Sequence, residues 1–333
     1  MYLCIAKNAI CEFMASSDQI LALIKSHMYG DDERFRLIAA QIAAAESKAG
    51  HRVVSSLIKQ ELNSKPTITM RMRRMNPVNA ELSEMVLEVD KGFVLNDLIS
   101  PSSVTEKVNR VIREYHHREK LSEYRLQNRR KLLLAGPSGT GKTMTASVIA
   151  NEVRLPLYVV LMEKVVTKFM GETSLKLSKI FDLIAQSPGV YLFDEFDAIG
   201  VQRGLDNEVG EQRRILNSFL QFMERDDSGS IIISATNSVE SLDKALFRRF
   251  DEVINYQLPS SQEIETLILR QMEGFLPASI CLEMITPLFD KMSHAEITLV
   301  CRDVMKESLL MDKAVNYELI SSVVAQRYLA YAN

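Results

Sequence analysis

The 333-residue sequence lacks the features that define several other classes of protein. No apolar run approaches the roughly 18 residues that indicate a transmembrane helix. The first residues contain no convincing small-residue cleavage site, so we expect no signal peptide. A net charge of −3 at pH 7 gives no overall bias toward nucleic acid or a membrane surface. We therefore expect a cytoplasmic protein with no membrane partner.

Protease signatures and paired cysteines are also missing. Neither HExxH nor GxSxG occurs, so any proteolysis would need a separate partner protein. The four cysteines, Cys4, Cys11, Cys281 and Cys301, show neither CxxC nor Cys/His ligand spacing. Isolated cysteines are typical of reduced thiols in a cytosolic protein. The sequence is otherwise that of a soluble protein with a sizeable core, because 47% of its residues are hydrophobic and 25% are charged.

The N-terminal region has apolar residues at helical spacing in three stretches, at about 17–30, 31–50 and 52–62. They predict a small helical domain over residues 1–64, which is either a structural appendage or a docking module that selects a substrate. Met14 precedes a helix-capping signal and is an alternative natural start.

Residues 65–94 interrupt the helical pattern with two prolines and predict a linker, within which residues 85–89 could form a short strand. The linker carries a basic cluster, Arg71, Arg73 and Arg74. We interpret this cluster as solvated, because it is short and no aromatic residues interleave with it. A nucleic-acid partner is therefore not expected.

Short apolar stretches then alternate with helical patterns, as in proteins whose parallel sheet is covered on both faces. The expected strands are residues 131–135, 155–160, 190–193, 231–233 and 253–258. Beyond residue 261 only helical patterns remain. The predicted fold class is α/β, with a parallel sheet flanked by helices over residues 95–260 and an all-α lid domain over residues 261–333.

The first of these strands leads into a G-x-x-x-x-G-K-T phosphate loop and then a helix, the context that this motif requires. Glycines let backbone N–H groups surround phosphates, and the helix N-terminus favours negative charge. Lys142 is expected to reach the β- and γ-phosphates, and the Thr143 hydroxyl to ligate Mg²⁺. The predicted nucleotide-binding residues are Gly136, Pro137, Ser138, Gly139, Thr140, Gly141, Lys142, Thr143 and Met144. The sheet is therefore that of a P-loop NTPase.

Two further strands end in polar residues that suit nucleotide hydrolysis. Asp194 is placed to hold Mg²⁺, directly or through water, and Glu195 to orient or deprotonate the attacking water. Asn237 follows the next strand and could bond the γ-phosphate or the attacking water, although asparagine there is often only a turn residue. Together with the phosphate loop, these residues predict ATP and Mg²⁺ as ligands.

Over about residues 95–325 the chain resembles the AAA branch of the AAA+ ATPases. Asn237 and residues 242–251 are similar to the family's second region of homology, where the asparagine is the sensor-1 residue. Arg248 and Arg249 match the arginine fingers, which the family inserts into the neighbouring subunit's ATP site to neutralise transition-state charge. The two arginines are adjacent here, whereas many members separate them by Pro-Gly, so either one is a candidate for the principal finger.

The resemblance also implies a ring with a central pore. Lys168, Phe169, Met170 and Gly171 resemble the first pore loop, whose aromatic and aliphatic pair grips an extended chain. Without the family, an apolar pair before a helix is more often part of a core. Residues 202–210 correspond to the second pore loop.

In the predicted lid, residues 293–297 resemble the Ser-Gly-Ala-Asp segment of the AAA lid, with His294 in place of the glycine. Ala295 stands where other AAA+ branches carry a sensor-2 arginine, which favours the protein-remodelling branch. Adenine is expected between this segment and the start of the α/β domain, although His294 could equally be a solvated turn residue. The residues assigned to this contact are Asp97, Leu98, Ile99, His294 and Ala295.

The sequence therefore predicts a Mg²⁺-dependent ATPase that assembles into a homo-oligomeric ring, a hexamer, and unfolds, disassembles or remodels protein substrates through its pore. The alternatives are a nucleotide-gated scaffold or adaptor, and a DNA-linked AAA+ motor suggested only by the basic cluster. The chain is similar to bacterial stand-alone members with short helical N-terminal domains. Some of those proteins serve a separate protease or a defence system.

Overall fold

The computed structural model describes residues 21–23, 25, 32–48, 54–56, 58, 72–74, 82–90, 92–167, 170–197, 206–238, 244–277 and 280–331. The chain divides into two compact units, Met1–Ile68 and Thr69–Asn333. This division falls inside the segment that the sequence predicts as a linker.

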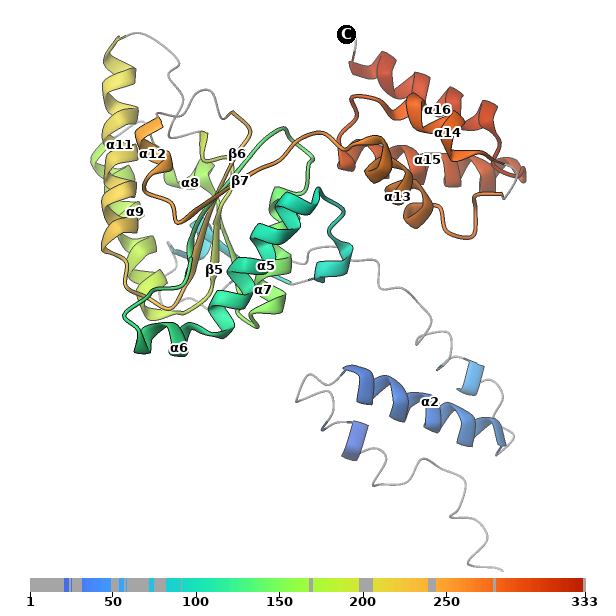
Figure 1. Cartoon of the computed structure of the whole chain (residues 1–333), viewed down its shortest axis with the longest axis horizontal. Helices are drawn as coiled ribbons and strands as arrows, with labels where there is room; N and C mark the ends of the chain where they lie inside the picture. The colour runs from blue at the N-terminus through green and yellow to red at the C-terminus, as the bar shows by residue number, and fades with distance from the viewer. Residues whose placement is uncertain are drawn as a thin grey trace, which may run out of the picture. The chain divides into compact units, whose positions relative to one another are not determined.

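The first unit contains helix α2 (Asp32–Lys48), drawn in blue in Figure 1. Its Ile38, Ala39 and Ala43 side chains are buried, and their spacing places them on one face of the helix. The amphipathic helix predicted near residue 31 is therefore present. Most residues of the two flanking predicted helices lie outside the described part of the chain.

The second unit is built on one seven-stranded sheet in the order β1-β2-β4-β5-β6-β3-β7. The strands are β1 (Met72–Arg74), β2 (Val86–Val89), β3 (Lys131–Ala135), β4 (Leu157–Val160), β5 (Val190–Phe193), β6 (Ile231–Thr236) and β7 (Glu252–Asn255). Neighbouring strands from β3 to β7 run parallel, as predicted from their apolar sequences.

Strands β1 and β2 add an antiparallel edge to the predicted parallel sheet, so the whole sheet is mixed and mostly parallel. β2 pairs antiparallel with β4, and β1 pairs antiparallel with β2. An antiparallel strand at the edge of a parallel sheet is a common arrangement. The segment 65–94 thus contributes two strands, and the short strand expected at residues 85–89 is β2. Arg73 and Arg74 of the basic cluster lie in β1 rather than in irregular chain.

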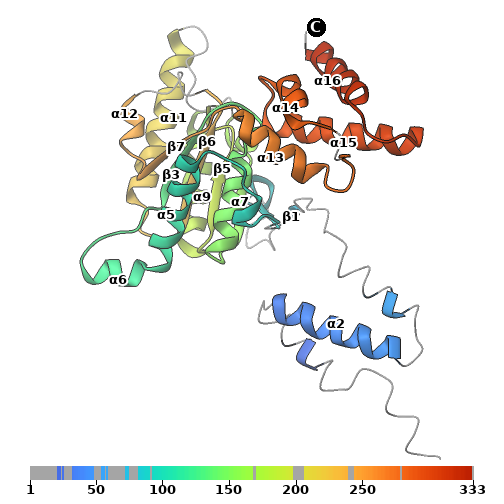
Figure 2. The same cartoon turned by 45° about the vertical axis from the view of Figure 1, so that its right-hand side comes forward.

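Helices cover both faces of this sheet. The elements of the α/β part are α4 (Leu82–Met85), η1 (Leu95–Asp97), α5 (Ser102–His116), α6 (Arg118–Glu123), α7 (Lys142–Glu152), α8 (Met162–Val165), α9 (Met170–Gln186), α11 (Asp206–Arg225) and α12 (Lys244–Phe247). Helices α5 and α7 lie on one face of the sheet, and α9 and α11 on the other (Figure 1; Figure 2).

Each face of the sheet has its own apolar core. Along β5, Leu192 packs on the side of α5 and α7, whereas Phe193 packs on the side of α9 and α11. Phe193 and Phe219 stand edge to face with ring centroids 5.0 Å apart, a favourable aromatic geometry. This alternation along a buried strand holds the sheet rigid between two layers of helices.

The lid is all-α, as predicted. It consists of α13 (Ser261–Gln271), α14 (Leu282–Ile285), η2 (Thr286–Phe289), α15 (His294–Met311) and α16 (Tyr317–Tyr331) around a core of its own. Ser260 and Ser293 cap α13 and α15 in capping boxes with a glutamate three residues later. Cys281 and Cys301 are free thiols. Among the described residues, no helix has the length and apolar character needed to cross a membrane.

Candidate active site

The carboxyl ends of β3, β5 and β6 bring the predicted nucleotide-binding residues to one edge of the sheet. β3 and β5 both pair in parallel with β6, so the phosphate loop, Asp194 and Asn237 follow three adjacent strand ends. The Gly136 N–H donates to the Thr236 carbonyl at 3.2 Å, which ties the start of the loop to β6.

The phosphate loop adopts backbone conformations that favour glycine. Gly136, Gly139 and Gly141 have φ angles of 148°, 72° and 101°. A Cβ atom at Gly136 would lie 2.4 Å from the Tyr256 carbonyl oxygen, and one at Gly139 would lie 2.6 Å from Ser293 Oγ. Close packing therefore leaves no room for a side chain at these two positions.

Lys142 lies buried at the centre of the loop. Its Nζ donates to the carbonyl oxygens of Gly136 and Pro137 at 2.7 and 2.8 Å and to Asn237 Oδ1 at 2.8 Å. Burial lowers the pKa of Lys142, and the carboxylate of Asp194 opposes that shift. Because all three acceptors are neutral, an anionic phosphate would be a stronger partner for the ammonium group.

Thr143 and Asp194, the residues predicted to hold Mg²⁺, are in contact. Thr143 Oγ1 donates to Asp194 Oδ2 at 2.9 Å. The other carboxylate oxygen accepts from the Glu195 N–H at 2.9 Å, which orients the carboxylate. A hydroxyl and a carboxylate are oxygen ligands of the kind that Mg²⁺ prefers when nucleotide phosphates supply the rest. The residues present therefore fit this ion.

Glu195 stands in a left-handed turn, with a φ of 53°. This conformation costs a non-glycine residue roughly 1–2 kcal/mol, so the surroundings must hold it. Phe196 supplies that support, because its side chain is fully buried and its N–H donates to the Ala235 carbonyl at 2.8 Å. With Phe196 anchored in the core, the turn leaves Glu195 exposed at the sheet edge, where water can reach it.

A further carboxylate, Asp197, was missed by the sequence prediction. Its Oδ1 lies 3.4 Å from the backbone nitrogen of Asn237 and 3.4 Å from Thr236 Oγ1. It also favours the charged form of Lys142. The available signal was an Asp-Glu-x-Asp pattern that begins at Asp194, but spacing alone does not say that the last carboxylate turns back toward β6.

Arg248 and Arg249 are both exposed on a turn that two buried side chains anchor. Leu246 and Phe250, on either side of the pair, belong to the core beneath α9 and α11. Arg249 forms an ion pair with Glu224 of α11. Among the residues that the structure describes, no hydrogen bond or ion pair joins either arginine to the phosphate loop. One chain therefore presents these cations at its surface and not in its own site.

The part of the chain that carries these residues matches a known family. Residues 132–258 match the family described as ATPase family associated with various cellular activities (AAA). An uncharacterised AAA family ATPase of Sinorhizobium fredii is 29% identical over 301 residues, which are 89% of this chain and 90% of that protein. The chain is an AAA-family ATPase.

Other AAA relatives are longer than this chain. A putative 26S proteasome regulatory subunit homologue of Methanothermobacter thermautotrophicus is 30% identical over 63% of this chain and 57% of its own length. The ATP-dependent zinc metalloprotease FtsH of Lancefieldella parvula is 31% identical over 54% of this chain and 29% of its own length. The crystal structure of the FIGL-1 AAA domain superposes with a TM-score of 0.59 at 20% identity, covering 73% of this chain and 86% of that one, which shows the shared fold.

In this AAA ATPase, the two segments predicted to enclose adenine both border the phosphate loop. The Ala295 N–H donates to the Gly139 carbonyl at 3.0 Å. On the other side, a Cβ atom at Gly141 would lie 3.9 Å from Leu98 Cδ1. A cavity of about 940 Å³ opens beside Leu98 and Ile99. The adenine contact itself stays a prediction.

The ring nitrogens of His294 are buried, and Asp97 pairs with a residue of the lid. His294 is the first residue of α15, and both of its ring nitrogens are buried, so it is not a solvated turn residue. Burial lowers the pKa of His294, which favours the neutral ring. The Asp97 carboxylate accepts from the Val94 N–H at 3.0 Å and pairs with Arg270 of α13. It therefore fastens η1 to the lid.

The predicted pore loops are only partly described. Lys168 and Phe169 lie outside the described residues, Met170 is the first residue of α9, and Gly171 is exposed in the first turn of that helix. In the second predicted pore loop, the latter half of residues 202–210 belongs to α11. Helix α11 thus begins inside the segment predicted as a loop, because its first turn is polar and carries no apolar periodicity that would indicate a helix.

Proposed function

We propose that this ATPase works as a homo-oligomeric ring, a hexamer, that uses ATP hydrolysis to unfold, disassemble or remodel protein substrates drawn through a central pore. The observation that carries the proposal is the placement of the arginine pair. Arg248 and Arg249 are exposed on an anchored turn, and no polar contact in the described chain links them to the phosphate loop. Such cations suit the ATP site of a neighbouring subunit.

The residues of one subunit would share the work of phosphoryl transfer. Lys142, which now bonds Asn237 and loop carbonyls, would turn to the phosphates, and Asn237 would then be released toward the γ-phosphate. The exposed Glu195 carboxylate would take the proton of the attacking water. Arg248 or Arg249 of the neighbour would neutralise the charge that develops on the transferred phosphoryl group.

The contact of Thr143 with Asp194 supports a requirement for Mg²⁺. These two oxygens would hold the ion together with ATP, Asp194 directly or through water. When bound, Mg²⁺ would neutralise phosphate charge. The hydrogen of the Thr143 hydroxyl, which now points to Asp194, would have to turn away so that an oxygen lone pair faces the ion.

The names of the relatives support a protein substrate. They include a proteasome regulatory subunit homologue and zinc metalloproteases, and this chain carries neither HExxH nor GxSxG. We therefore propose that any proteolytic outcome depends on a separate protease partner, which the ring would supply with unfolded chain.

The Glu195→Gln variant tests the proposed function. It keeps the loop contacts but lacks the base, so with ATP and Mg²⁺ it should bind ATP, assemble and hold its substrate. Mass photometry should detect a hexamer, and a tagged ring should retain a protein that the wild-type ring releases. Lys142→Ala is the control and should bind neither ATP nor substrate. A Glu195→Gln protein that stays monomeric with ATP would contradict the ring.

Phe169→Ala separates threading from the rival scaffold function. A threading motor should lose remodelling of the captured substrate while keeping most of its basal ATPase activity, because Phe169 is assigned to the substrate and not to ATP. Lys164→Ala, an exposed change shortly before this loop, is the matched control and should retain both activities. Full remodelling by Phe169→Ala rings would argue against threading.

A further inference from the structure

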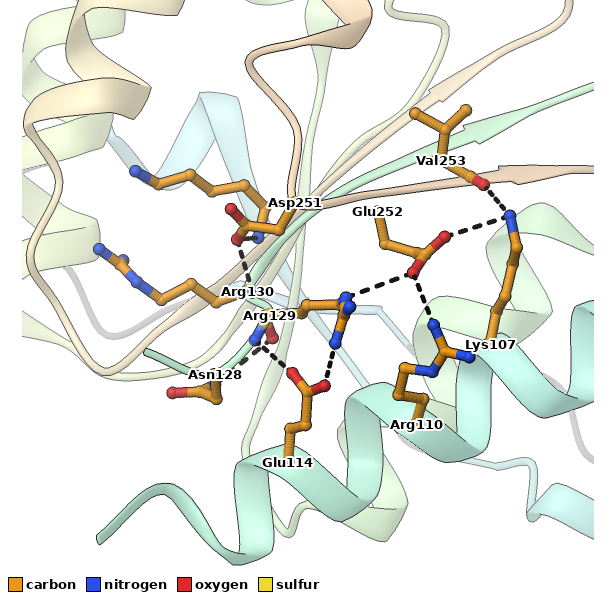
Figure 3. A network of polar contacts seen from close by, with 10 residues as sticks. Lys107, Arg110, Glu114, Asn128, Arg129, Arg130, Asp251, Glu252 and Val253 are labelled. Carbon is orange, nitrogen blue, oxygen red and sulfur yellow. Dashed lines mark hydrogen bonds and ion pairs between the residues drawn. The ribbon is translucent and has the colours of Figure 1, made fainter. Parts of the chain in front are cut away.

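Two residues that follow shortly after the arginine pair, Asp251 and Glu252, are bound to two other elements of the fold (Figure 3). Asp251 and Glu252 are both carboxylates, and each accepts bonds from more than one donor. These contacts lie at the amino ends of β3 and β7, the opposite end of the sheet from the phosphate loop.

Asp251 joins the arginine turn to β3. Its Oδ2 accepts from the Arg130 and Lys131 N–H groups at 2.9 Å each, and its own N–H donates to the Lys131 carbonyl at 2.8 Å. Two amides on one carboxylate oxygen hold the side chain in one orientation. Because β3 ends at Ala135, directly before Gly136, the arginine turn and the phosphate loop of one subunit stand at opposite ends of the same rigid strand.

Glu252 joins the same segment to α5. Its side chain is only 12% exposed and pairs with Lys107 at 3.1 Å, Arg129 at 3.3 Å and Arg110 at 3.9 Å. Lys107 Nζ also donates to the Val253 carbonyl at 2.6 Å. Several charges that share partners in this way form a network, which holds geometry better than an isolated surface pair.

The arginine side chains themselves are held only loosely. Arg249 pairs with Glu224, but the two side chains are 46% and 44% exposed, and such surface pairs contribute about 0–1 kcal/mol. Arg248 is exposed, and no ion pair of its side chain exists within the described residues. The turn therefore has a fixed base and two side chains that a neighbouring anion can recruit.

We propose that Asp251 is a positioning residue for the arginine pair. By fixing the backbone of the turn to β3, it sets where Arg248 and Arg249 stand relative to the neighbouring subunit. This inference rests on the proposed function, in which the arginines act on ATP bound by the neighbour. Cations stabilise a transition state best when they are already in place, and a displacement of about 1 Å can cost about 10²-fold in rate.

Asp251→Ala should lower kcat about tenfold or more while the KM for ATP changes less than about twofold, because the phosphate loop is untouched. Asp251→Asn retains an oxygen that can accept from both N–H groups and should restore most of kcat. Asp227→Ala removes the same charge at an exposed site and should match the wild type. An Asp251→Asn enzyme as slow as Asp251→Ala would overturn the role proposed for these hydrogen bonds.

A mixed-ring experiment separates positioning from damage to the variant's own site. Lys142→Ala/Asp251→Ala subunits cannot turn over ATP, so they affect a wild-type neighbour only through their arginine turn. Mixed equally with wild-type subunits and co-purified through two tags, they should give about half the turnover obtained with Lys142→Ala subunits. Turnover falls by half because, in a closed ring mixed equally, about half of the wild-type sites have a variant subunit as the neighbour that supplies the arginines.

Lys142→Ala/Arg248→Ala/Arg249→Ala subunits are the reference for complete loss of the arginines. If they inhibit no more than Lys142→Ala subunits, action across the interface is wrong, and the proposed function falls with the inference. If they inhibit more and Lys142→Ala/Asp251→Ala subunits do not, the inference alone is overturned. Similar inhibition by these two kinds of subunit, with closely similar melting temperatures for all variants, would support it.

Discussion

The two ends of strand β3 hold their charged groups in contrasting ways. At the carboxyl end, Lys142 is buried against three neutral oxygens. At the amino end, the buried guanidinium of Arg130 pairs with the buried carboxylate of Asp226. A charge with neutral partners can be recruited by an anionic ligand, whereas a charge with a fixed counter-ion cannot. One end of the strand is thus suited to receive an anion, and the other to hold the fold.

The residues at the carboxyl end of β3 are also in energetically less favourable states than those at its amino end. Burial lowers the pKa of Lys142, and Glu195 adopts a left-handed backbone conformation. Strained or incompletely compensated groups of this kind concentrate at functional sites. At the amino end, by contrast, Asp251 and Glu252 have several donors each.

Breaking the carboxyl end should give the largest effect. Lys142→Met should lower ATP turnover by about 10²–10³-fold, because it removes the cation aimed at the phosphates. Without nucleotide, its melting temperature should equal or exceed that of the wild type, because burial already disfavours the ammonium charge. Turnover assays and calorimetry measure the two quantities. Lys313→Met, at an exposed position, is the control. If the melting temperature fell clearly in Lys142→Met but not in Lys313→Met, the contrast drawn between the two ends of β3 would be wrong.

Breaking the amino end should instead cost stability. Asp226→Ala leaves the Arg130 guanidinium buried without its counter-ion and should lower the free energy of unfolding by about 3 kcal/mol. The fraction that stays folded should bind ATP with unchanged affinity, since the phosphate loop lies at the other end of the sheet. Urea titration and ATP binding below the unfolding transition measure these effects. Asp227→Ala, which is exposed next to it, should be within about 0.5 kcal/mol of the wild type.

A smaller effect should come from the buried hydrogen bond beneath the loop. Tyr256 Oη lies 2.6 Å from Thr145 Oγ1, between β7 and α7. Tyr256→Phe should lower the free energy of unfolding by about 1 kcal/mol and change the KM for ATP little, because neither Tyr256 nor Thr145 belongs to the phosphate loop. Tyr124→Phe, at a residue that is 71% exposed, is the control. Equal stability of the two variants would show that the bond contributes nothing to the fold.

The smallest effect should be on the pH dependence of stability. Burial lowers the pKa of folded His294 below its ordinary value of 6.5, so the unfolded chain binds this proton more readily. Stability should therefore fall as the pH drops below about 6.5 and level off below the folded pKa. His294→Gln should remove this part of the loss between about pH 7.5 and about pH 5.5, measured by calorimetry. If the wild type and His294→Gln lost the same amount of stability over this pH range, His294 would not be a buried neutral ring.

The grouping of the phosphate loop, Asp194 and Asn237 at one edge of the sheet was largely predictable because its signals are local. The phosphate loop, Asp194 and Asn237 each follow a short apolar strand, and parallel strands place such residues together. Asp197 and Asp251 were not predictable, since an acidic residue looks the same in sequence whether it faces solvent or a distant backbone amide. Asp251 finds its amides about 120 residues earlier in the chain.

The sequence by itself determined the family and the alternation of strands and helices, along with the residue types predicted to meet a nucleotide. These depend on local spacing and on periodic apolar residues, which are visible in any short window. Only the tertiary structure decided that β1 and β2 add an antiparallel edge, that Lys142 bonds Asn237, and that the arginine turn is fastened to β3. Such pairings join segments far apart in the chain, and their partners are selected by packing and hydrogen-bond satisfaction over the whole fold.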